Sequence, residues 1–193
     1  MGSALAASVC QQLAQDQYSD PAAVIGKFSA EKEEGSRLFR EKKPQDAVTC
    51  WLDACIDIDK LVESSSWPKL VRRGGVEFVS QLAPVYFLMH PNVAHVGVST
   101  MSCFVAEQTA ESALNFAVRS IGKKYWTKGY KYLPSVTHLA KLRYRYAIFY
   151  RLQGNPENAQ RALEYINAAV ELQPGDAAIM KEKGNILDWM ACI

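Results

Sequence analysis

Two stretches of this 193-residue chain have the pattern of two consecutive amphipathic helices joined by a short turn. In the first stretch, residues 30–58, Pro44 marks a break and begins the second helix. In the second stretch, residues 136–172, the turn is Gly154-Asn155-Pro156, which combines a good cap with a good first helical residue. The pattern therefore predicts an all-α protein built from antiparallel helical hairpins.

The two hairpins carry small residues at equivalent positions. Gly35 and Ala147 share one position on the first helices. The second helices share an order of small, bulky and small residues, which is Ala47, Trp51 and Ala54 in one hairpin and Ala162, Ile166 and Ala169 in the other. Small residues let two helices approach closely, and the bulky residue fills the gap to the next hairpin.

This order of residues resembles the tetratricopeptide repeat family, whose units span about 34 residues and end near a proline. The resemblance covers residues 30–60 as repeat 1 and residues 136–174 as repeat 3. A degenerate repeat 2 is expected over residues 93–122, with Ala110, Leu114 and Ala117 on its second helix. The resemblance implies a single domain in which the hairpins stack into a right-handed superhelix.

The remaining segments are interpreted around this array. Residues 177–191 are expected to form a capping helix, and residues 1–22 an extra N-terminal helix. Residues 61–92 match no repeat and are interpreted as an insertion. Within it, Pro84 is expected to break the apolar run, and His90-Pro91 to end it.

Composition excludes several classes of function. No apolar run approaches the ~20 residues of a membrane span, and no leader pattern is visible, so a cytoplasmic location is predicted. The five cysteines are scattered and predict reduced thiols. We expect neither a metal site nor a cofactor, because no zinc-ligand spacing, phosphate loop or nucleophile–base pair is recognisable. An enzyme is therefore disfavoured.

Positive charge is concentrated locally. Residues 113–156 contain nine lysines and arginines and no aspartate or glutamate, although the whole chain has a net charge of only +2. In this region Lys141 and Arg145 stand four residues apart, which places both on one helical face. Such a pair of cations is suited to bind an anionic group.

The cations also resemble those of one branch of the repeat family. In co-chaperones and immunophilins of this type, lysines, asparagines and an arginine form a carboxylate clamp for the Glu-Glu-Val-Asp tail of heat-shock chaperones. Lys32 matches the lysine of the first repeat, and Lys141 and Arg145 match the pair of the third. Ser36 and Val96 stand where asparagines are expected. The resemblance implies binding of an acidic, C-terminal-carboxylate peptide.

Two alternatives remain at the level of sequence. A basic-aromatic segment, residues 123–132, has the composition of single-stranded nucleic-acid binders, although a pI of about 8.2 argues against that use. Its candidate residues are Lys123, Lys124, Trp126, Lys128 and Lys131. The same segment also suits an acidic protein or an anionic membrane surface.

The second alternative is a scaffold that binds a folded partner through apolar area. Its candidate residues are Phe78, Leu82, Tyr86, Phe87 and Leu88. A final motif, from Lys181 to Asn185, matches the first-repeat clamp sequence, but these residues are expected to face solvent on the capping helix.

Overall fold

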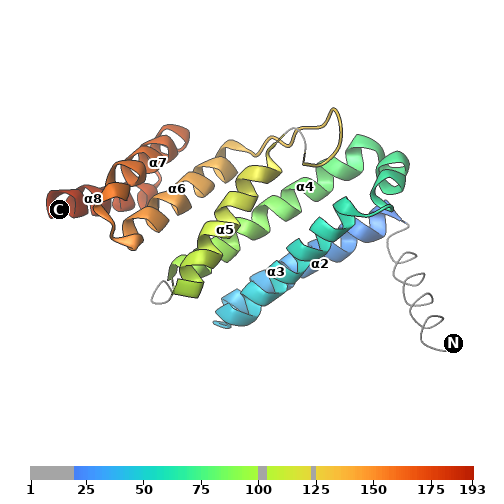
Figure 1. Ribbon diagram of the computed structural model, residues 1–193, viewed down its shortest axis with the longest axis horizontal. Coiled ribbons are helices and arrows are strands. Elements are labelled where there is room, and N and C mark those ends of the chain that lie inside the picture. The colour runs from blue at the N-terminus through green and yellow to red at the C-terminus, as the bar shows by residue number, and fades with distance from the viewer. Residues whose placement is uncertain (1–19, 100–103, 123–124) are drawn as a thin grey trace.

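The computed structural model describes residues 20–99, 104–122 and 125–193, and all regular elements in these ranges are helices, as predicted (Figure 1). They are α2 (Pro21–Arg40), α3 (Pro44–Glu63), α4 (Trp67–Ser99), α5 (Phe104–Ser120), α6 (Val136–Gln153), the short 3₁₀ helix η1 (Pro156–Asn158), α7 (Ala159–Leu172) and α8 (Ala177–Ala191). The helix predicted over residues 1–22 lies mostly outside the described residues.

Local capping interactions explain why the C-terminal helices begin and end close to the predicted positions. The Ser135 side chain accepts a hydrogen bond from a backbone N–H in the first turn of α6, and Asp176 accepts two such bonds in α8. Gly154 ends α6 in the left-handed conformation, with a φ of 67°. Asn155 then caps η1, which leads into α7.

Helix α4 continues through Pro84 and Pro91, so the predicted break and end are wrong. A proline removes one helical hydrogen bond, but burial of this helix among four neighbours outweighs that loss. The helical geometry is instead interrupted at Gly75, whose φ is 61°. The expected boundary between the insertion (residues 61–92) and repeat 2 (residues 93–122) therefore falls inside α4. The part of α4 after Gly75 packs against α5 as a helical hairpin.

The helices form hairpins that follow one another along the long axis of the molecule (Figure 1). Helices α2, α4, α6 and α8 pack side by side in that order. Helix α3 packs between α2 and α4, helix α5 between α4 and α6, and helix α7 between α6 and α8. The last helix, α8, covers α6 and α7. Helix α4 consequently lies between α2 and α6, with α3 and α5 packed on it.

The small residues identified in the sequence lie at the helix contacts. All the predicted alanine positions are at most 2% exposed, namely Ala47, Ala54, Ala110, Ala117, Ala147, Ala162 and Ala169. The bulky positions Trp51 and Ile166 are also buried. A Cβ atom at Gly35 would lie only 2.6 Å from Cδ1 of Trp51, so this position admits no side chain. The predicted close approach of α2 and α3 is confirmed.

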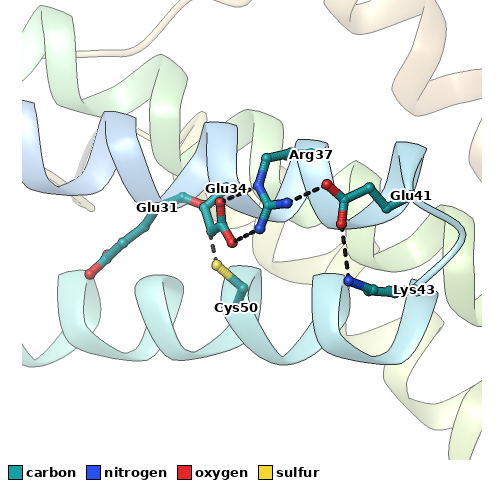
Figure 2. Close-up of polar contacts among 6 residues, drawn as sticks. All are labelled: Glu31, Glu34, Arg37, Glu41, Lys43 and Cys50. Carbon is teal, nitrogen blue, oxygen red and sulfur yellow. Dashed lines mark hydrogen bonds and ion pairs between the residues drawn. The ribbon is translucent and has the colours of Figure 1, made fainter.

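The α2–α3 turn carries a network of exposed charges (Figure 2). Arg37 lies between Glu34 and Glu41, and it donates hydrogen bonds to both carboxylates. Lys43 donates to the other oxygen of Glu41 across the turn, at 3.0 Å. These pairs hold the end of α2 against the start of α3, each with the small free energy typical of surface ion pairs.

The described residues also bear on a possible membrane span and on the state of the cysteines. Within the described ranges, no helix has the length and hydropathy required to cross a bilayer. Cys50, Cys55 and Cys192 are free thiols. The Cys50 thiol donates to the backbone carbonyl of Glu31 on the facing helix, and burial raises its pKa (Figure 2).

Candidate functional site

Cations from two helices that are not consecutive in the chain line one cavity of about 210 Å³. Lys32 comes from α2, while Lys141 and Arg145 come from α6. Because α4 packs between α2 and α6, its side chains form the floor of the cavity. The other lining residues are Phe87, Leu88, Pro91, Asn92 and His138. None of the residues that line this cavity carries a carboxylate.

Lys32 is held in place through its backbone. Its carbonyl oxygen accepts a hydrogen bond from Nε1 of Trp51 at 3.1 Å and another from Oγ of Ser36 at 2.9 Å. The ammonium group pairs with Glu33, whose side chain is 64% exposed. Ser36 does not line the cavity, and its hydroxyl donates to the Lys32 carbonyl. Its expected part in peptide binding stays a prediction.

Arg145 is a partly buried cation of the cavity. Its Nε atom is buried and has no hydrogen-bond partner. Burial lowers the pKa of Arg145 to about 10, so the guanidinium is still charged at neutral pH. Among the described residues, no carboxylate pairs with Arg145 or Lys141. A partly buried guanidinium without a counter-ion is unfavourable, and a bound anion would relieve that penalty.

Two histidines lie close to these cations. His138 lines the cavity, and its pKa is lowered by burial and then by the charge of Lys141. His95 is on α4, where burial and the charge of Arg145 lower its pKa to about 4. Both histidines are consequently neutral near pH 7 when the cavity is empty of anions.

Asn92 is the lining residue that sequence reasoning missed. The expected second asparagine position was assigned to Val96, which is 3% exposed and does not line the cavity. Asn92 lies four residues earlier, one turn away on the same face of α4. The expected repeat begins near residue 93, whereas the long part of α4 begins just after Gly75.

The basic-aromatic segment has a structural role at its centre. Trp126 is 2% exposed, and its indole N–H donates to the carbonyl of Ser120 at 2.9 Å. The Trp126 carbonyl in turn accepts from Nε1 of Trp67 at 2.8 Å. The expectation that Trp126 stacks on a nucleic-acid base is therefore wrong, because its ring is already packed. Lys128 and Lys131 are exposed, while Lys123 and Lys124 lie outside the described residues.

The apolar residues proposed as a scaffold surface belong to the core. Phe78, Leu82, Tyr86 and Phe87 are at most 2% exposed. Only Leu88 of that set is partly exposed, on the floor of the cationic cavity. The expected surface patch is wrong, since α4 is covered on the sides that carry these residues.

The remaining predicted positions are less informative. Lys181 and Asn185 are exposed on α8, as expected, and Asn185 donates to Glu182 at 2.9 Å. No group of three or more potential metal ligands occurs in the described part of the chain.

Models of protein families, curated proteins and solved structures were compared with this chain, and none matched. Function must therefore be inferred from the geometry of the chain itself.

Proposed function

We propose that this chain is a non-catalytic adaptor of the tetratricopeptide repeat type that binds the free C-terminal carboxylate of an acidic peptide. The observation that supports this proposal is the convergence of Lys32, Lys141 and Arg145 on one cavity without a lining carboxylate. Repeated hairpins with buried small residues support the superhelical fold. The C-terminal tail of a heat-shock chaperone is one peptide with the required chemistry.

The cavity matches the chemistry of a terminal aspartate, which presents two carboxylates close together. The guanidinium of Arg145 can bind one carboxylate through a paired fork of N–H donors, and Lys141 can bind the other as a point charge. Asn92 adds a neutral amide donor from α4. Each charge-assisted hydrogen bond contributes about 1.5 to 3 kcal/mol, which is enough for selective binding of a short peptide.

Lys32 closes the site from the opposite side. Its pair with Glu33 is compatible with ligand binding, because an exposed ion pair contributes no more than about 1 kcal/mol. A peptide carboxylate in the partly buried cavity would compete for the same ammonium group. Tyr144 and Phe149 support the α6 wall by packing against the two hydrophobic cores.

Calorimetry with two versions of one acidic peptide tests this function. The peptide with a free C-terminal aspartate should bind the unmodified protein, and its C-terminally amidated form should bind at least tenfold more weakly. The Lys141→Ala/Arg145→Ala variant should keep its helical circular dichroism and lose binding. The matched control is Lys181→Ala/Lys183→Ala on α8, which removes the same charge away from the cavity and should bind normally.

Other results would contradict the proposal. Equal binding of the free and amidated peptides would exclude a clamp for the terminal carboxylate. A partner that is retained in a pull-down by the Lys141→Ala/Arg145→Ala variant would indicate a scaffold instead. Binding to a single-stranded oligonucleotide that weakens steeply with salt would indicate nucleic acid.

A further inference from the structure

A second cavity, of about 300 Å³, lies on the opposite side of α4, between α3 and α5. Its walls are largely apolar and include Leu52 and Ile56 of α3 and Ala113 of α5. None of the residues of the cationic cavity lines this one. Its volume is at the lower end of the range for small-molecule sites.

His90 of α4 lines this cavity and has no hydrogen-bond partner. The residue is 2% exposed, and both of its ring nitrogens are buried without a donor or an acceptor. Burial lowers the pKa of His90 to about 3, so the ring is neutral and offers one N–H donor and one acceptor. Two unmet polar atoms are unfavourable in a core and are uncommon without a functional reason.

The Phe116 ring packs against the His90 ring. It stacks on the imidazole with ring centroids 5.6 Å apart and an angle of 16° between the planes. Phe116 is itself only partly buried, and it also lines a larger neighbouring cavity of about 770 Å³. Displacement of this ring by the ring of a ligand would bring a polar ligand group to His90.

Asp59 supplies the charge of the site. It is the one carboxylate among the residues that line the 300 Å³ cavity, where His90 is neutral and burial raises the pKa of the Cys55 thiol well above its usual value. Its Oδ1 atom accepts hydrogen bonds from the hydroxyls of Tyr86 and Tyr125, which fix the carboxylate in place. The Tyr86 ring lies 4.5 Å from the His90 ring, so Asp59 and His90 flank the same tyrosine.

We infer that this cavity binds a small aromatic amine. The ammonium group pairs with Asp59, the ring lies between the apolar walls, and a hydroxyl or similar group meets the neutral imidazole of His90. A carboxylate-bearing ligand is excluded, because Asp59 would repel it. A wholly apolar ligand would leave the His90 nitrogens without partners. This site is separate from the carboxylate clamp and does not depend on it.

Three related probes test the inference by calorimetry with the full chain. Tyramine has both the ammonium group and the hydroxyl and should bind. Phenethylamine, which lacks the hydroxyl, should bind about three- to tenfold more weakly, as expected for one lost neutral hydrogen bond. The anion 3-(4-hydroxyphenyl)propionate should not bind. Failure of tyramine to bind, or equal binding of the anion, overturns the proposal.

Substitutions locate the probe within the cavity. Asp59→Asn keeps an oxygen acceptor for both tyrosines and should lower tyramine affinity at least tenfold. His90→Phe should lower tyramine affinity to the level of phenethylamine, leave phenethylamine affinity unchanged, and raise the melting temperature. Unchanged tyramine affinity in either variant contradicts the assignment.

Two exposed positions on α5 provide a check that does not alter the core. Ser112 lines the cavity, whereas its neighbour Glu111 does not. Ser112→Phe should block tyramine binding, and Glu111→Phe should leave it unchanged. Lys141→Ala/Arg145→Ala should bind tyramine normally, which separates failure of this site from failure of the clamp. Tyramine binding that Ser112→Phe leaves intact places the ligand elsewhere and overturns the proposal.

Discussion

Gly35 of α2 lies directly against the indole of Trp51 of α3, so closely that a Cβ atom at residue 35 would be 2.7 Å from Cε2 of the ring. The same indole donates its N–H to the carbonyl of Lys32, at 3.1 Å. Packing of Trp51 against Gly35 therefore also holds the backbone of Lys32, which is a cation of the proposed binding cavity.

Gly35→Ala should destabilise the protein although alanine favours helix formation. Overpacking against a buried ring costs about 1 to 3 kcal/mol, which exceeds the gain of about 1 kcal/mol in helix propensity. Urea denaturation should therefore show a lower free energy of unfolding. The variant should also bind the acidic peptide more weakly, because displacement of Trp51 releases the Lys32 carbonyl.

The matched control for this substitution is Gly184→Ala on α8, where a Cβ atom would meet nothing within 4 Å. It should raise the free energy of unfolding by about 0.5 to 1 kcal/mol. Equal effects of the two substitutions would show that the Gly35–Trp51 contact does not limit side-chain size.

Arg145→Met should separate stability from binding. Removal of a partly buried guanidinium whose Nε has no partner should leave the free energy of unfolding unchanged or higher. Affinity for the acidic peptide should fall about tenfold to hundredfold, since a charge-assisted hydrogen bond is lost. Denaturation and calorimetry on the same variant measure both quantities.

Arg143→Met is the control on the same helix. The Arg143 guanidinium lies over the Tyr165 ring, 5.4 Å from its centroid, and does not line the cationic cavity. Peptide affinity should not change in this variant. A large loss of stability in Arg145→Met would instead assign Arg145 a structural role.

Peptide binding should take up a proton at His138. Burial and the charge of Lys141 lower the pKa of His138 in the free protein, so the ring is neutral near pH 7. A bound carboxylate opposes the charges of Lys32, Lys141 and Arg145 and should raise that pKa. Affinity should therefore increase as pH falls from 8 to 6, by at most about tenfold per unit for one proton.

Calorimetry in buffers of different ionisation enthalpy measures this proton uptake directly. His138→Phe should abolish both the uptake and the increase in affinity at low pH. An affinity that is constant between pH 8 and pH 6 would show that the bound anion does not lie near His138.

The ion pair between Arg151 of α6 and Glu182 of α8 should be required for docking of the last helix. Nε of Arg151 donates to Oε1 of Glu182 at 2.6 Å, and the Glu182 side chain is only 6% exposed. Arg151→Met leaves that buried carboxylate without its counter-ion, so the free energy of unfolding should fall by about 3 kcal/mol.

A double substitution distinguishes two contributions to the free energy of unfolding: the cost of leaving Glu182 unpaired, and the stabilisation that the ion pair itself provides. Arg151→Met/Glu182→Leu should recover most of the stability, because an apolar pair often replaces a buried ion pair without loss. The exposed Arg161→Met substitution on α7 should have little effect on stability. No recovery in the double variant would mean that the pair itself stabilises α8.

The turns of the first and last hairpins and their close contacts were predictable because they depend on local signals. Pro44, Gly154 and Asn155 determine turns through restricted dihedrals and capping, and the spacing of small residues identifies helix faces that pack. These signals act within a few residues, so they are visible without knowledge of the partner helix. Convergence of Lys32, Lys141 and Arg145 was also anticipated, through the family resemblance.

The positions of Asn92, Trp126 and His90 depended on tertiary structure. Asn92 joins the cationic cavity because burial keeps α4 helical through Pro84 and Pro91, against local propensity. Trp126 is removed from the surface by its contacts with Ser120 and Trp67. Burial among distant segments determines these environments. The sequence by itself therefore determined the hairpins and their charged face, while packing decided which side chains line each cavity.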